Sequence, residues 1–147
     1  MRCAEVSRRT GETDINISLD LDGQGTSNLD TGMGFFEHML NLFTTHGQFN
    51  LKVECSGDLF VDGHHSVEDI GIALGQAFTK AMGDKVGIKR YGTAFVPMDE
   101  ALIMVSLDLS GRAFLNYEVL VKAQMIGDYD TELTEEFLRA FAFNAGI

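Results

Sequence analysis

The pattern of hydrophobic and polar residues predicts a chain that mixes strands and helices. Residues 13–21, TDINISLDL, alternate in hydrophobic character, as one half-buried strand does. Residues 34–46 carry apolar side chains at helical spacing, and Gly47 follows as a C-terminal stop. The short segment LKVEC, residues 51–55, predicts another strand. Apolar residues at helical spacing between positions 67 and 81 then predict a second helix.

The remaining third of the chain predicts a hairpin and a third helix. Two apolar runs, residues 102–109 and 113–121, flank Ser110 and Gly111, which together form a turn signal. Residues 131–145, TELTEEFLRAFAFNA, again place apolar side chains on one helical face.

Two segments of the chain are repeated. GETDINISLDLDG, residues 11–23, aligns without gaps with DEALIMVSLDLSG, residues 99–111, at an offset of 88, and seven of thirteen residues are shared. EHMLNLF, residues 37–43, matches EEFLRAF, residues 135–141, at an offset of 98. Amphipathic strands resemble one another by chance through their apolar positions, but these matches include polar Ser, Asp and Glu. The sequence therefore predicts an internal duplication.

The duplication defines the expected fold. We expect an α+β fold in a single domain, residues 1–147, in which one β-rich unit with helices occurs twice. Copy one covers about residues 1–86 and copy two about residues 87–147, so that the second copy is incomplete.

The composition excludes several classes of protein. A chain of 147 residues, 45% of them hydrophobic, is long enough for one domain with a sizeable core. No apolar run approaches the roughly 20 residues of a membrane span, and residues 1–10 lack a secretory signal, so we expect a cytoplasmic protein without a membrane partner. Cys3 and Cys55 predict free thiols. The net charge of −11 argues against nucleic acid, although a few arginines can still bind a small anion.

The stretch DGHHSVEDIG is the strongest candidate for chemistry. One interpretation is a capping box, with Ser66 as the N-cap and Asp69 three residues later. It leaves His64 and His65 unexplained, although single histidines are more often structural than ligating. We expect both histidines in extended chain just before the helix, diverging toward two metal ions, with Glu68 closing back on one of them. Such ligands suit Mn, Fe or Zn.

Five segments carry a family signature. They are RRTGETDINISLDLDG, TGMGFFEHML, DGHHSVEDIGIALGQA, RYGTAFVPMDEALIMVSLDLSGR and DTELTEEF, and together they cover almost all of the chain. In content and order they resemble the imidazoleglycerol-phosphate dehydratases of histidine biosynthesis. The resemblance implies helices packed against two β-sheets and a homo-oligomer of 24 subunits with Mn²⁺ sites between subunits. It also implies two Mn²⁺ per active site and a small phosphorylated imidazole as substrate.

The same resemblance implies roles for individual residues. The positions that match metal ligands are His38, His64, His65 and Glu68, together with Glu136, which stands where some members carry a histidine. The positions that match substrate contacts are the acid Glu12, His46 in a substrate-lining segment, and the phosphate-site arginines Arg90 and Arg112. Leu42 replaces a glutamine that some members use near the phosphate. We expect Glu12 and Glu68 to be the catalytic carboxylates, with Glu12 transferring a proton.

Other interpretations remain open from the residues alone. Glu12 could be a solvated turn residue, and Arg112 could be a surface residue of a hairpin. The histidines would also suit a metal-binding module without catalysis, or an assembly protein in which they bridge subunits. A metal-dependent dehydration of imidazole glycerol phosphate to imidazole acetol phosphate explains all of these residues together.

Copy two ends early in the repeat. In copy one, 45 residues lead from His38 to the glycine after the second helix, whereas 11 residues follow the matching Glu136. By symmetry we expect the parent chain to continue for roughly 35 residues or more, with a second HH-x-x-E near about position 160. We expect the 147 residues alone to be inactive, poorly metallated and prone to aggregate, with Leu138, Phe141 and Phe143 uncovered.

Overall fold

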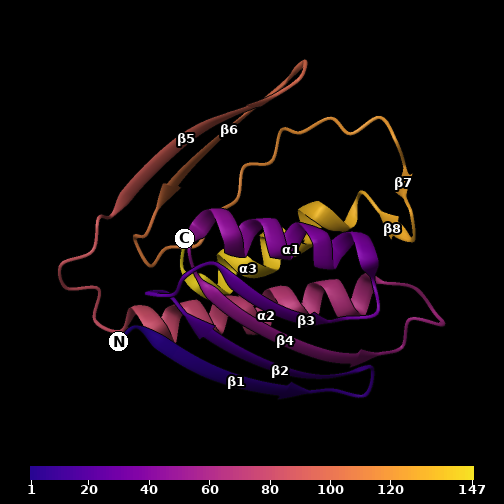
Figure 1. Cartoon of the computed structure of the whole chain (residues 1–147), viewed down its shortest axis with the longest axis horizontal. Coiled ribbons are helices and arrows are strands. Elements are labelled where there is room, and N and C mark those ends of the chain that lie inside the picture. The colour runs from indigo at the N-terminus through magenta and orange to yellow at the C-terminus, as the bar shows by residue number, and fades with distance from the viewer.

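Strands and helices are mixed along the whole chain, and the computed structural model describes residues 1–147 (Figure 1). The elements in chain order are β1 (Cys3–Arg9), β2 (Thr13–Asp20), β3 (Thr26–Asp30), α1 (Gly34–Gly47), β4 (Asn50–Gly57), α2 (His64–Met82), β5 (Tyr91–Met98), β6 (Ala101–Asp108), β7 (Met125–Ile126), β8 (Tyr129–Asp130) and α3 (Leu133–Ala145). The α+β class predicted from the sequence is confirmed.

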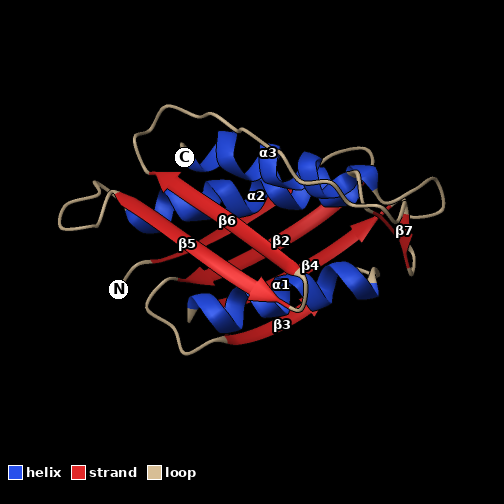
Figure 2. Ribbon diagram, turned by 90° about the horizontal axis from the view of Figure 1, so that it is seen from above, coloured by secondary structure: helices blue, strands red, loops and turns tan.

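The larger sheet has four strands in the order β1-β2-β4-β3. β2 pairs antiparallel with β1 and β4, and β3 joins β4 in parallel. The alternation of β2 is confirmed, because Ile15, Ile17 and Leu19 are buried, and Val53 and Leu51 of β4 lie opposite the last two. The helices cover this face of the sheet. The β5–β6 hairpin lies beyond the helices, and its strands cross those of the larger sheet (Figure 2).

α2 packs between the larger sheet and α3. Its predicted apolar face is confirmed, since Val67, Ile70 and Leu74 are fully buried. Gly71 and Gly75 lie where α3 approaches most closely. A Cβ on Gly75 would lie 2.6 Å from the carbonyl oxygen of Phe141, so the absence of a side chain brings the two helices together.

The duplication is visible in the backbone. β2 and β6 coincide at the offset of 88, and each is the second strand of an antiparallel hairpin, β1–β2 or β5–β6. Even a single backbone hydrogen bond recurs. The Leu21 N–H donates to the carbonyl of Arg2 at 2.9 Å, and the Leu109 N–H donates to that of Arg90 at 3.0 Å. α1 and α3 match in the same way at the offset of 98.

The predicted hairpin around Ser110 and Gly111 was wrong. The hairpin lies earlier, because β6 pairs back onto β5 through a tight turn at Asp99, whose φ is 49°. Residues 113–121 form no strand. Gly111 instead donates its N–H to the carbonyl of Gly146, at 2.8 Å, which directs the chain toward the end of α3.

The exposed apolar surface is concentrated on the β5–β6 hairpin. The large apolar side chains exposed there are Tyr91, Phe95, Val96, Met98, Leu102, Ile103, Met104, Val105 and Leu107. On α3, only Phe143 of the three expected residues is exposed, because Phe141 packs against Phe78 with ring centroids 5.0 Å apart. No helix combines the length and apolar character needed to cross a membrane.

The close approach of α2 and α3 generates a stability prediction. Gly75→Ala should destabilise the fold by about 1–3 kcal/mol, because the new methyl group meets backbone atoms of α3 that cannot rotate away. The matched control is Gly34→Ala at the start of α1, where nothing lies within 4 Å of the new Cβ. Denaturant unfolding of both variants measures the difference. Equal stabilities would show that the two helices do not require a glycine here.

Candidate active site

Three segments that are far apart in the sequence meet at the start of α2. The first is the turn between β1 and β2, which contains Glu12. The second is Asp58, the residue that follows β4. The third is the histidine pair that opens α2. The N–H of Asp58 donates to the carbonyl of Glu12 at 3.1 Å. We call this region, residues 10–13, 58 and 64–69, the histidine end of the molecule.

His65 is held by a carboxylate. Its Nδ1 lies 2.9 Å from Oδ2 of Asp58, and this hydrogen bond raises the pKa of His65 above the ordinary value of 6.5. The nearby carboxylates of Glu12 and Asp62 raise it further. Because Nδ1 is occupied by Asp58, Nε2 is the ring nitrogen left for a ligand. A histidine oriented by a carboxylate in this way is typical of metal sites.

His64 points in a different direction from His65. The two ring centroids are 6.0 Å apart and the ring planes are inclined by 74°. Nδ1 of His64 lies 3.9 Å from a carboxylate oxygen of Glu68, one helical turn later, so Glu68 does approach it as expected. His64 also lines a cavity of about 500 Å³ together with Glu136 of α3. Two of the expected metal ligands therefore share one cavity.

The predicted capping box was wrong. The helix already begins at His64, its N-cap is Gly63, and neither residue of the box caps it. Ser66 lies inside the helix, two residues after its start, and is fully buried. Asp69 turns toward the sheet, where its Oδ2 accepts a hydrogen bond from the Thr13 hydroxyl at 2.5 Å. The two histidines diverge because neighbouring helical residues point in different directions, and not because the chain is extended.

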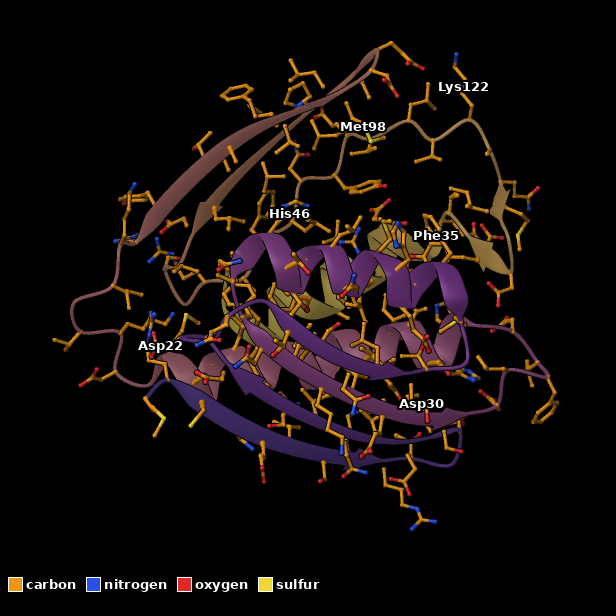
Figure 3. All side chains as sticks on the ribbon, viewed as in Figure 1. Asp22, Asp30, Phe35, His46, Met98 and Lys122 are labelled. Atoms are coloured by element: carbon orange, nitrogen blue, oxygen red, sulfur yellow. The ribbon has the colours of Figure 1, made fainter.

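The remaining expected ligands do not complete a site within one chain. His38 is exposed on α1, and His46 is exposed near the end of the same helix (Figure 3). No three His, Cys, Asp or Glu side chains of the chain come close enough to hold one metal ion. The expected ligands carry nitrogen and oxygen donors that suit a metal ion, and they are accessible. Within one chain, however, too few of them lie together to complete a metal site.

The two arginines expected at the phosphate site lie at the open end of the β5–β6 hairpin. Arg90 makes two hydrogen bonds to Asp108, of 2.7 and 3.1 Å. These bonds lower the pKa of Asp108, and the positive charges of Arg112 and Lys85 lower it further. The charges of three cations therefore act on one carboxylate, and one of the three, Arg90, contacts it. We call Lys85, Arg90, Asp108 and Arg112 the arginine end.

The histidine end and the arginine end are far apart in one chain. α2 begins at the first and finishes near the second, and its 19 residues extend about 28 Å. Sequence reasoning missed Asp58, Thr10, Thr13 and Lys85. No local pattern marks Asp58, Thr13 and Lys85, because their side-chain or main-chain contacts join segments distant in the chain. Thr10 fixes its own turn, and a threonine in a turn is too common to mark a site.

The fold and the site define an α+β protein with a histidine-rich end and a separate cationic end, and the comparisons with known proteins identify its family. The family model for imidazoleglycerol-phosphate dehydratase matches residues 31–147. The chain belongs to the imidazoleglycerol-phosphate dehydratase family, whose members are lyases of histidine biosynthesis. It is therefore an enzyme of the dehydratase class.

Relatives and solved structures support this assignment along nearly the whole chain. The dehydratase of Acetivibrio thermocellus is 60% identical over 97% of this chain and 73% of its own length. That of Caldanaerobacter subterraneus is 59% identical over 100% and 76%. The crystal structure of the Staphylococcus aureus enzyme has a TM-score of 0.87 at 42% identity, covering 98% of this chain and 79% of that one. The Pyrococcus furiosus enzyme gives 0.81 at 31% identity, with coverages of 95% and 74%.

The contact between Asp58 and His65 generates a prediction about pH. In the metal-free protein, Asp58→Asn should lower the pKa of His65, because the carboxylate that stabilises the imidazolium is lost. Asp62→Asn is the control and should have a smaller effect, since Asp62 acts only through its more distant charge. NMR titration of the ring protons measures both.

The sign of the stability effect follows from the same shift. A raised pKa means that the contact stabilises the folded chain below about pH 6.5, the unfolded value. This stabilisation is lost as the pH rises through the raised pKa. An unchanged pKa in Asp58→Asn would contradict the assignment of the hydrogen bond.

Proposed function

We propose that this protein dehydrates imidazole glycerol phosphate to imidazole acetol phosphate in a metal-dependent reaction of histidine biosynthesis, in the cytoplasm. The observation that carries the proposal is the meeting of Glu12, Asp58 and His65 at the histidine end. The main chain of an acidic residue is fixed near a histidine whose ring is oriented by a carboxylate, in a chain of the dehydratase family. Such an arrangement suits proton transfer beside a metal ion.

Mn²⁺ is the metal that we propose, with two ions per active site. His64 and His65 diverge, so each would serve a different ion, and Glu68 lies beside His64. His38 and Glu136 would supply further donors. A second cavity, of about 490 Å³, is lined by His64 and by several carboxylates. Their negative charge favours a divalent cation. When bound, the metal would stabilise the imidazole ring of the substrate in its anionic form.

Glu12 is our candidate for proton transfer. Dehydration of the substrate removes a weakly acidic C–H proton and expels a hydroxyl group, so a carboxylate is needed within reach of the reacting carbons. The side chain of Glu12 is exposed at the histidine end, while its main chain is fixed by Asp58. Glu68 is the second carboxylate that we assign to the catalytic centre.

Arg90 and Arg112 are proposed to bind the phosphate of the substrate, with His46 lining the substrate site. The guanidinium group of Arg90 uses two N–H groups on Asp108 and retains others for a phosphate oxygen. Lys85 adds positive charge nearby. A cationic cluster of this kind offsets the net charge of −11, which would otherwise repel an anionic substrate.

The distance between the two ends supports a shared site in a homo-oligomer. About 28 Å of α2 separates the histidine end from the arginine end, which is far more than a small phosphorylated imidazole spans. One chain therefore cannot offer both sets to one substrate molecule. We propose that the histidine end of one subunit works with the arginine end of another, in an assembly of 24 subunits.

A change at Glu12 tests the function. The full-length protein with Mn²⁺ should turn over imidazole glycerol phosphate. Glu12→Gln should lower kcat by about 10²–10⁴-fold while the metal content stays the same, because only the proton-transfer group is removed. Glu5→Gln, on the exposed side of β1, is the matched control and should retain full turnover. Full activity of Glu12→Gln would exclude Glu12 as the acid–base group. If the wild-type protein did not turn over imidazole glycerol phosphate, the proposed substrate would be wrong.

The metal content should depend on pH. Histidine ligates metal only as the neutral imidazole, so protons should displace Mn²⁺ as the pH falls from 7.5 to 5, through the histidine pKa of about 6.5. The raised pKa of His65 makes it protonate earlier than an ordinary histidine. Elemental analysis of dialysed full-length protein at both pH values measures the loss. Equal metal contents would count against histidine ligation.

A further inference from the structure

The main chain of Glu12 is held at both of its polar groups. The Thr10 hydroxyl accepts hydrogen bonds from the N–H groups of Glu12 and Thr13, at 3.1 and 3.0 Å. The Glu12 carbonyl accepts the N–H of Asp58 at 3.1 Å. Threonine side chains fix turns in this way by replacing a main-chain partner. The turn that carries the proposed proton-transfer group therefore has a defined conformation, although it is at the surface.

This turn is anchored to α2 by a buried carboxylate. Oδ2 of Asp69 accepts the Thr13 hydroxyl at 2.5 Å and lies 3.5 Å from the Thr10 hydroxyl. The guanidinium group of Arg8 approaches the same oxygen at 2.7 Å as an ion pair. Thr13 is 3% exposed and Asp69 is 9% exposed, so water competes little with these contacts. Asp69 follows His65 by one helical turn.

The second copy of the repeat shows that the hairpin itself does not need this anchor. At the offset of 88, Thr10 corresponds to Met98 and Thr13 corresponds to Ala101. The β5–β6 hairpin nevertheless closes with the same strand pairing, and its turn carries Glu100 at the place of Glu12. The two hydroxyls occur in the β1–β2 hairpin, beside the histidine pair, and not in the β5–β6 hairpin. Their role is therefore more than the closure of a turn.

We propose that Asp69, acting through the hydroxyls of Thr13 and Thr10, is a positioning residue that fixes Glu12 relative to the histidine pair of α2. The proposal rests on the proposed function of Glu12. Asp69 touches neither the substrate nor the metal. It links the turn to the helix that begins with the histidines, so the carboxylate of Glu12 and the imidazole rings share one rigid support. Misplacement of a reacting group by about 1 Å can lower a rate by about 10²-fold.

The test compares two substitutions of Thr13 in the full-length protein loaded with Mn²⁺. Thr13→Val keeps the shape but removes the hydroxyl, and it should lower kcat by about 10–10²-fold, with KM and metal content changed less than about twofold. Thr13→Ser restores the hydroxyl and should recover most of the turnover. Ile15→Val, in the core of the same strand, is the control for a loss of stability alone and should retain kcat.

A second variant separates this proposal from the function of Glu12. In the Glu12→Gln background, Thr13→Val should have no further effect on kcat, because the group that it positions is already removed. An additional loss of the full size there would overturn the proposal, as would normal turnover of Thr13→Val. If Glu12→Gln alone were fully active, the proposed role of Glu12 would fail.

Amide hydrogen exchange then tests, independently of turnover, whether the Thr13 hydroxyl holds the turn that carries Glu12. The amide of Glu12 should exchange faster in Thr13→Val than in the wild type and should be protected again in Thr13→Ser. Equal protection in all three proteins would show that the hydroxyl does not hold the turn.

Discussion

The burial of α2 between the four-stranded sheet and α3 is the constraint on which the rest of the molecule depends. Its apolar face fills the core above β1 and β2, and Gly71 and Gly75 let α3 approach its other side. A helix packed on two sides cannot rotate or slide without loss of these contacts. Its first turn, which carries His64 and His65, is therefore fixed relative to the sheet although both side chains remain accessible.

The sequence could predict the elements whose burial is periodic. β2, α1, α2 and α3 each bury one face, so the spacing of apolar residues revealed them. β1 and β3 were missed because their side chains are largely polar and lie at the edges of the sheet. The hairpin was misplaced because the apolar run 113–121 resembles a strand, whereas its backbone pairs with none. The spacing of apolar residues indicates which face of a segment is buried, but it does not indicate which strand the segment pairs with.

The sequence indicated candidate residues for the site but not how they are arranged in space. The HH-x-x-E spacing identified the histidine pair, and the offset of the repeat was enough to match Glu136 with His38. Asp58 and Asp69 were not recognised as partners, because the turn that they hold is 56 residues from Asp69 in the chain. Asp69 was even assigned to a helix cap, since an acidic residue at that spacing fits a local rule equally well. A rule that uses only neighbouring residues cannot show whether a side chain such as Asp69 binds a nearby main-chain group or a residue distant in the chain.

The duplication gives a physical reason for the separation of the two ends. Arg2 and Arg90 occupy equivalent places at the open ends of their hairpins, and each pairs with an aspartate there. The turn ends of the hairpins carry Glu12 and Glu100, also in equivalent places. Each copy thus has a cationic open end and an acidic turn, about one hairpin length apart. Because a repeat preserves this polarity, neither hairpin brings its own cationic end to its own acidic turn. The shared site that we propose for the assembly agrees with this polarity and requires no rearrangement inside the chain.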